Sequence, residues 1–365
     1  MMKNTRNILL LLLVATSMIS CYPVKKSAFR ENAKIKNVIF LIGDGMGIAH
    51  TYAAMTISEN PLNIERCEIT GLQKTFSANN YITDSGAAGT SLAGGKKTNN
   101  GAIGVDDQGN KLKTLLEISE ENGLATGLVS SSAVTHATPA SFIAHQSSRG
   151  SYEDIAADFL KTDIDVFIGG GYDHFARRAD GVDLTQALAS KGYEVITSME
   201  VLRKSEAMKI AGLVYPQQPP YRLKGRGDML PEATGKAIEI LSRNPKGFFL
   251  MVEGSQIDWA AHAHAADTLL DETLDFDGAA GIALDFAMKE GNTLVIITAD
   301  HETGGVTITG GDRKLKTVEL SFSTPGHTAV MVPVYAFGPG SGKFTGIYDN
   351  TELFQKILDS WRFGK

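Results

Sequence analysis

Residues 37–47 read Asn-Val-Ile-Phe-Leu-Ile-Gly-Asp-Gly-Met-Gly, an apolar run that ends in an aspartate between glycines. An apolar run without alternation is typical of a parallel strand that is buried on both faces. The flanking glycines allow the backbone to turn sharply, so the carboxylate of Asp44 can approach a bound ion. The alternative is a turn in which Asp44 caps the next helix. The spacing differs from the G-x-G-x-x-G fingerprint of dinucleotide-binding proteins.

The rest of the chain repeats this pattern of apolar runs that alternate with amphipathic stretches. Strands are predicted at residues 37–42, 125–130, 164–168, 193–196, 248–252, 293–298 and 330–337, and helices at 112–122, 152–161, 184–191, 232–243 and 268–290. Residues 172–230 are less regular, and Pro216, Pro219 and Pro220 mark a loop there, so an insertion beside the active site is expected. The alternation predicts an α/β three-layer sandwich, in which a large, mostly parallel central sheet carries helices on both faces. Residues 36–365 are expected to form one domain.

The charge balance and the N-terminus indicate where the protein works. The formal net charge of −6 argues against specific nucleic-acid binding. Lys3 and Arg6 precede seven apolar residues at 8–14, a run too short to cross a membrane. Residues 18–21, Met-Ile-Ser-Cys, resemble a lipobox, which predicts a signal peptide at 1–20 that is cleaved before Cys21, a lipid anchor on Cys21 and a tether at 21–35. The alternative is an ordinary cleaved signal.

These features predict a periplasmic or cell-envelope protein that is bound to a membrane by its lipid. If Cys21 carries lipid, the other cysteine, Cys67, has no disulfide partner and is expected in the interior.

Chemically active residues recur where the predicted strands end, and this edge is where ligands bind in open parallel sheets. Thr83-Asp84-Ser85-Gly86 places a serine where a helix begins, although a helix cap is the alternative. Glu253 ends the strand at 248–252, and Asp258 and His262 follow with the i, i+4 spacing that lets two side chains share one metal. A surface ion pair is the alternative there.

Two further sequences supply more ligands: Asp300-His301 after the strand at 293–298, and His327 before the last strand. Nitrogen and oxygen ligands in this mixture suit zinc, with a harder oxygen site for magnesium. The set as a whole predicts a hydrolase with several metal ions.

The order D-G-M-G, T-D-S-G-A-A, H-A-T-P, V-E-G-S-Q-I-D-x-x-x-H, T-A-D-H and P-G-H resembles the bacterial alkaline phosphatases across residues 36–365. The resemblance implies hydrolysis of small phosphate monoesters, with Ser85 as the nucleophile that forms a phosphoserine and Arg149 as the group that grips phosphate. It also implies two Zn²⁺ sites and one Mg²⁺-type site. The first Zn²⁺ would be held by Asp258, His262 and His327, and the second by Asp300 and His301. The Mg²⁺-type site would be held by Asp44, Thr138 and Glu253, with Asp44 bridging it to the second Zn²⁺ site. Homodimers are frequent in the family.

Two positions depart from the best-known bacterial pattern. His136 stands where an aspartate is often found, and Trp259 replaces a common lysine, so both are expected beside the substrate or the metal ligands. The alternative interpretations of the sequence are a related sulfatase and a related phosphodiesterase. Ser85-Gly86-Ala87 lacks the sulfatase signature C/S-x-P-x-R, and Thr138, Glu253 and Arg149 favour monoesters over diesters. A further alternative is a lipoprotein that binds metal or phosphate without catalysis. Such a protein would lack at least one of the groups that are essential for the reaction.

Overall fold

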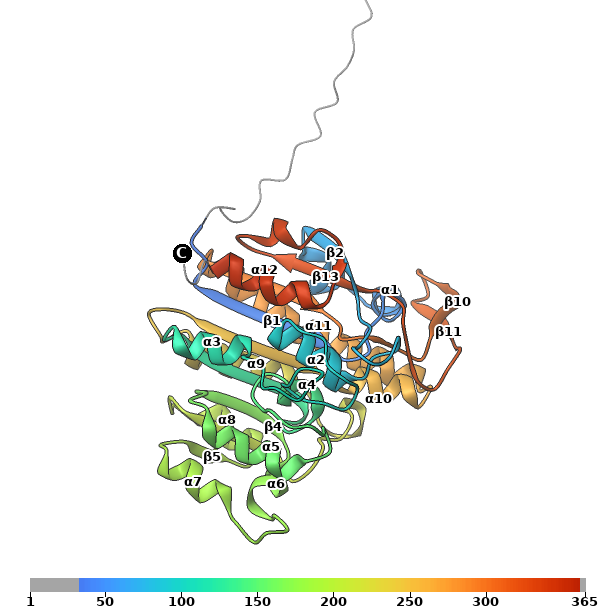
Figure 1. Ribbon diagram of the computed structural model, residues 1–365. Coiled ribbons are helices and arrows are strands. Elements are labelled where there is room, and N and C mark those ends of the chain that lie inside the picture. Colours follow the sequence, from blue (N-terminus) through green and yellow to red (C-terminus); the bar gives the residue numbers. More distant parts are fainter. Residues whose placement is uncertain (1–32, 362–365) are drawn as a thin grey trace, which may run out of the picture.

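A ten-stranded sheet forms the centre of the computed structural model, which describes residues 33–361 (Figure 1). In spatial order, its strands are β14 (Gly346–Asp349), β2 (Ile69–Lys74), β13 (Val332–Phe337), β8 (Thr293–Thr298), β1 (Asn37–Gly43), β7 (Phe248–Gly254), β3 (Ala125–Ala133), β4 (Val166–Gly170), β6 (Ile210–Tyr215) and β5 (Glu194–Ile196). β13 runs antiparallel to both of its neighbours, and the other neighbouring pairs are parallel. The predicted sheet is confirmed.

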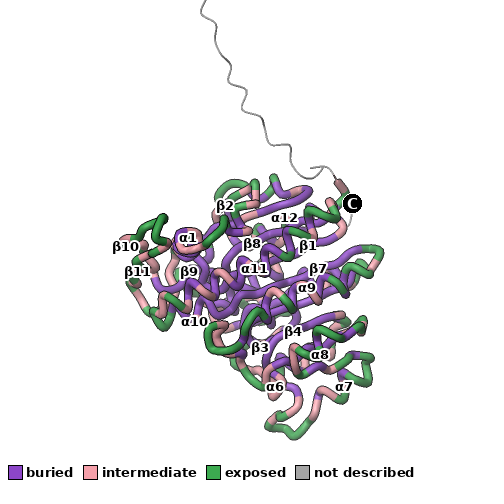
Figure 2. Tube along the Cα trace, turned by 180° about the vertical axis from the view of Figure 1, so that it is seen from behind, coloured by how far each residue is buried: buried purple, intermediate pink, exposed green. Residues whose placement is uncertain are grey.

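Helices cover both faces of this sheet because its strands are apolar on both sides. In β1, Phe40 faces one core layer and Leu41 the other, and both are fully buried. The first layer is covered by α2 (Ser85–Gly94), α3 (Leu115–Glu121), α4 (Ala137–Ala140), α5 (Tyr152–Asp158), α6 (Tyr172–Ala176), α7 (Leu184–Ser190) and α12 (Thr351–Trp361). The second is covered by α1 (Ile48–Ile57), α8 (Met199–Lys204), α9 (Met229–Leu241), α10 (Gln256–His262) and α11 (Ala266–Glu290). Figure 2 shows the strands buried between these layers, as expected of a three-layer sandwich.

Smaller elements complete the fold. The hairpin of β10 (Val306–Asp312) and β11 (Thr317–Phe322) projects beside α1 (Figure 1), and β9 (Glu302–Thr303) pairs with β12 (His327–Thr328). Single 3-10 turns are η1 (Asn63–Arg66), η2 (Phe159–Lys161), η3 (Arg222–Lys224) and η4 (Ser341–Phe344). Among the described residues no helix is both long enough and apolar enough to span a bilayer.

The seven predicted strands and five predicted helices all exist, with boundaries that differ by a few residues. The expectation of an irregular insertion at 172–230 is wrong in part, because this segment adds β5 and β6 to one edge of the sheet. Its proline-rich loop approaches the site, where Pro219 O accepts a hydrogen bond from Gln256. Cys67 is half-buried against the second core layer, and burial raises the pKa of its thiol to about 12. The predicted signal peptide, Cys21 and most of the tether lie outside the described residues.

Candidate metal centre

The candidate site lies where four adjacent strands, in the order β8, β1, β7 and β3, end at the same edge of the sheet. Asp44 follows β1, Glu253 is the last residue but one of β7, and Asp300 comes two residues after the end of β8. The turn after β1 needs a glycine at position 45, where φ is +72° and a Cβ atom would lie 3.0 Å from Asp258 Cα. A parallel sheet therefore brings together side chains that are more than 200 residues apart in sequence.

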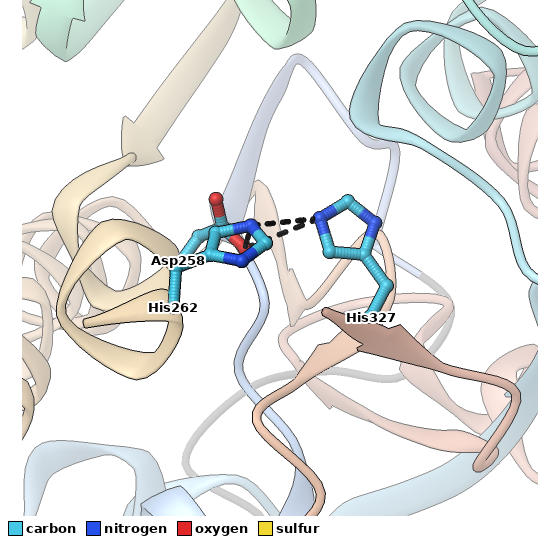
Figure 3. Close-up of side chains that lie close together, drawn as sticks. All are labelled: Asp258, His262 and His327. Carbon is cyan, nitrogen blue, oxygen red and sulfur yellow. Dashed lines mark hydrogen bonds and ion pairs between the residues drawn. The ribbon is translucent and has the colours of Figure 1, made fainter. Parts of the chain in front are cut away.

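The first cluster consists of Asp258 and His262 from α10 with His327 from β12 (Figure 3). The Nε2 atoms of the two histidines are 3.1 Å apart, and they lie 3.3 Å and 3.5 Å from Asp258 Oδ1. Each imidazole donates its Nδ1 hydrogen to a backbone carbonyl, His262 to Pro325 and His327 to Thr83. This arrangement fixes the tautomer and leaves Nε2 available for a metal.

The second cluster joins Asp44, Asp258 and His301, whose ligand atoms lie within 4.8 Å of one another. Asp300 belongs beside them, because its Oδ2 is 3.2 Å from His301 Nε2. The other oxygen of Asp300 accepts hydrogen bonds from the backbone N–H groups of Gly45 and His301, at 3.1 and 3.0 Å. Asp300 is thus held by one oxygen, and the other faces the cluster.

The third cluster consists of Asp44, His136 and Glu253, all buried. Thr138 joins it through a hydroxyl that donates to Asp44 Oδ2 over 3.4 Å. Asp44 therefore lies between two clusters, as the family pattern implies. We expected His136 to lie beside the metal ligands. In the structure one of its own ring nitrogens is close enough to the carboxylates of Asp44 and Glu253 to be a ligand itself.

Ser85 is the first residue of α2, and its hydroxyl lies 3.3 Å from His301 Nε2. The cap of this helix is Asp84, whose Oδ1 accepts from Ala87 N at 2.9 Å. The helix cap, which was the alternative prediction here, is therefore confirmed for Asp84. Because Asp84 caps the helix, the hydroxyl of Ser85 can face the clusters. At a helix N-terminus the backbone dipoles favour an anion.

Arg149 and Trp259 border the clusters. Arg149 Nη1 donates to Asp84 Oδ2 over 2.9 Å, and 30% of the arginine side chain is exposed, so the guanidinium can be reached by a ligand. Trp259 is half-buried and meets the ring of His136 edge to face, with centroids 5.5 Å apart. Both predicted residues therefore lie at the site.

The electrostatics of the clusters favour cations. Burial, together with the nearby carboxylates, raises the pKa of Asp44 well above its usual range, and burial raises that of Asp300 to about 8. Burial also opposes ionisation of Asp258, but the hydrogen bond from His262 and the neighbouring imidazoles lower its pKa. Burial lowers the pKa of His136 to about 3 and that of His301 well below its usual value, which keeps both rings neutral. Neutral imidazoles beside crowded carboxylates are the form that binds metal.

Buried polar atoms without partners test whether these residues fit metal ions. Asp44 Oδ1, His136 Nδ1, Glu253 Oε1 and Asp300 Oδ2 have no hydrogen-bond partner among the described residues. Buried polar groups are normally paired, so four orphaned ligand atoms in the second and third clusters fit cations well.

Several supporting residues were not predicted from the sequence. Asp84 holds Arg149, Thr303 contacts both Asp258 Oδ1 and His301 Nδ1, and serines at positions 130 and 132 surround Glu253. The run Ser130-Ser131-Ser132 at a strand end was the only sequence signal for the serines. Asp84 and Thr303 adjoin predicted residues but carry no pattern of their own.

Comparisons with known proteins give the family of this chain. The family model described as alkaline phosphatase matches residues 35–321. The chain belongs to the alkaline phosphatase family. It is 34% identical to alkaline phosphatase 4 of Bacillus subtilis (strain 168), over 92% of this chain and 91% of that protein. It is 32% identical to the alkaline phosphatase of Escherichia coli (strain K12), over 87% and 84% of the two chains.

Among solved structures, alkaline phosphatase from the Antarctic bacterium TAB5 superposes with a TM-score of 0.87. It is 42% identical to this chain, and the match covers 91% of this chain and all of that one. The family resemblance, the fold and the enzyme class expected from the sequence, a phosphoric monoester hydrolase, are confirmed.

Proposed function

We propose that the protein hydrolyses phosphate monoesters through a covalent phosphoserine on Ser85, with two zinc ions and one magnesium ion as cofactors. The position of Ser85 carries this proposal. Its hydroxyl lies at the N-terminus of α2, 3.3 Å from a nitrogen of His301, which belongs to the second cluster. The serine oxygen would form a bond to phosphorus as the bond to the leaving alcohol breaks. Water would then split the phosphoserine and restore the hydroxyl.

Arg149 would orient the phosphate. A guanidinium offers two parallel N–H donors that match two phosphate oxygens. Asp84 accepts from one terminal nitrogen of Arg149 and so aims the side chain. Zinc held by the first two clusters would supply Lewis-acid stabilisation of negative charge and would lower the pKa of an oxygen bound to it.

The donor atoms support the choice of metals. Asp258 with His262 and His327 gives one oxygen and two nitrogens, a set typical of zinc. Oxygens of Asp44, Thr138 and Glu253 dominate the third cluster and suit magnesium, although His136 adds a nitrogen. A similar solved structure, a histidine-to-aspartate mutant of TAB5 alkaline phosphatase, has Mg bound in its M3 site. It shows that an alkaline phosphatase can hold Mg at a site where an aspartate replaces a histidine.

Steady-state rates on a monoester, a diester and a sulfate ester with one common leaving group test the substrate class. We expect the monoester to have the highest kcat/KM, and a diester or sulfate hydrolysed faster would overturn the proposal. Metal analysis, followed by chelation and add-back of Zn²⁺ and Mg²⁺ separately, tests the cofactors. Recovery without zinc would contradict the zinc assignment.

We also propose that the enzyme is lipidated on Cys21, works in the periplasm or cell envelope and is a homodimer. The lipobox-like Met18-Ile19-Ser20-Cys21 supports the first two points, and the frequency of dimers in the family supports the third. Detergent partitioning of the parent and of Cys21→Ser tests the lipid anchor, and light scattering of the detergent-free variant tests the dimer. A variant that still partitions into detergent, or a monomeric mass, would contradict them.

A further inference from the structure

Two buried hydroxyl groups donate to one carboxylate oxygen of the third cluster, and a third hydroxyl lies beside them. Ser130 Oγ donates to Glu253 Oε2 over 2.5 Å, and Ser132 Oγ reaches the same oxygen over 3.2 Å. Ser255 Oγ lies 3.0 Å from Ser130 Oγ. All three serines and the glutamate are fully buried. We call Ser130, Ser132 and Ser255 the serine cage.

Ser130 is the centre of the serine cage. It pairs directly with Glu253 in the parallel register of β3 and β7, so its side chain is placed by the sheet itself. Its oxygen also accepts from Ser132 N at 2.9 Å and lies 2.7 Å from Ser132 Oγ. The β3–β4 ladder is irregular between Val129 and Ala133, which frees this stretch of β3 for the serine contacts.

The cage treats the two oxygens of Glu253 differently. Oε2 receives the hydroxyl donors, whereas Oε1 is buried and has no hydrogen-bond partner among the described residues. A carboxylate fixed at one oxygen cannot rotate freely, so the other oxygen keeps a constant direction. Glu253 forms one ligand group with Asp44 and His136, and Oε1 is the oxygen left for their cation.

We propose that Ser130 is a positioning residue for the third metal site: it holds Glu253 Oε2 so that Oε1 faces the cation. This inference rests on the third site of the proposed function. Partners that orient metal ligands typically change metal affinity by about tenfold to a hundredfold when they are removed. Replacing Ser130 with alanine removes the shortest donor to Oε2 and the acceptor for Ser132 N. Ser132 remains, but at a longer distance and with Ala133 O as a competing acceptor.

The test is Mg²⁺ affinity, measured by calorimetry on full-length protein that has been chelated and reloaded with zinc. We expect Ser130→Ala to bind Mg²⁺ about tenfold to a hundredfold more weakly than the parent, with unchanged zinc content. Ser119→Ala is the matched control, since Ser119 is equally buried but donates to Leu115 O within α3. It should bind Mg²⁺ as the parent does.

Two outcomes would overturn the inference, and they can be told apart. If Glu253→Gln abolishes Mg²⁺ binding but Ser130→Ala leaves it unchanged, the third site stands and the role of Ser130 is wrong. If the parent shows no binding that depends on Glu253, the proposed third site is wrong and the inference falls with it. Should Ser130→Ala fail to fold, Ser132→Ala replaces it: a measurable but smaller loss of affinity supports the cage, and an unchanged affinity rejects it.

Discussion

Replacing Asp84 with alanine should weaken both the helix that carries Ser85 and the grip on phosphate. Asp84 accepts three hydrogen bonds, from Ala87 N at 2.9 Å, Gly101 N at 3.1 Å and Arg149 Nη1 at 2.9 Å. The helix cap is worth about 1 kcal/mol, the part-buried bond from Gly101 about 1 kcal/mol, and the partly exposed ion pair about 0–1 kcal/mol. The free energy of unfolding should therefore fall by about 2–3 kcal/mol.

The same change frees Arg149. Ordering a long side chain on binding costs about 0.5–1.5 kcal/mol, so inhibition by inorganic phosphate should weaken about twofold to twelvefold. Urea unfolding and the phosphate inhibition constant measure the two effects. Asp183→Ala is the matched control, because Asp183 caps α7 through Thr185 N at 2.9 Å without contacting an arginine. It should lose about 1 kcal/mol of stability. Phosphate inhibition that is unchanged in Asp84→Ala, or equally weakened in Asp183→Ala, would refute the reasoning.

Three further predictions concern pH, stability and product binding. In the metal-free protein the hydrogen bond to Asp258 raises the pKa of His262 to about 9. The protonated imidazole of His262 therefore stabilises the fold fully below pH 6.5, and this stabilisation is lost as the pH rises through 9. Zinc must displace the proton on the imidazole of His262, so zinc affinity should rise with pH up to about 9. A zinc affinity that does not change with pH would contradict this prediction. Arg226→Ala should cost about 3–5 kcal/mol in urea unfolding, because it removes the buried guanidinium that pairs with the buried carboxylates of Glu272 and Asp275. The exposed pair of Arg177 is the control, since Arg177→Ala should cost almost nothing; equal losses would be inconsistent. Trp259→Lys should strengthen phosphate inhibition by adding a charge beside the site, and an unchanged inhibition constant would count against this.

The layers of the fold could be predicted because parallel strands buried on both faces are continuous apolar runs. Strand β1 illustrates this, since every residue from Asn37 to Gly43 is buried. Strands β2 and β14 were missed because they lie at one edge of the sheet, where a mixture of exposed and buried residues hides the pattern. Strand β6, Ile210–Tyr215, is apolar enough to predict, but it lies in a segment whose prolines suggested a loop.

Most of the candidate ligands could be predicted because they lie at the end of a strand or share a helix face with another. His327 precedes a strand, and Thr138 followed only from the family resemblance. Asp258 and His262 needed only the i, i+4 rule. The residues that hold the ligands could not be found in this way. Thr303 contacts Asp258, which is 45 residues away, and this contact depends on how β9 packs against α10. Ser130 contacts Glu253, which is 123 residues away, and this contact depends on the register between β3 and β7.

The proposed mechanism depends most on Ser85, the residue that would accept the phosphoryl group at the metal centre. The direct measurement is rapid acid quenching of the zinc-loaded enzyme during turnover of a labelled monoester, followed by mapping of the label. We predict label on Ser85 in the parent, none after chelation, and none in Ser85→Ala, whose kcat should fall by at least about a thousandfold. Label on another residue, or undiminished turnover by Ser85→Ala, would contradict the account.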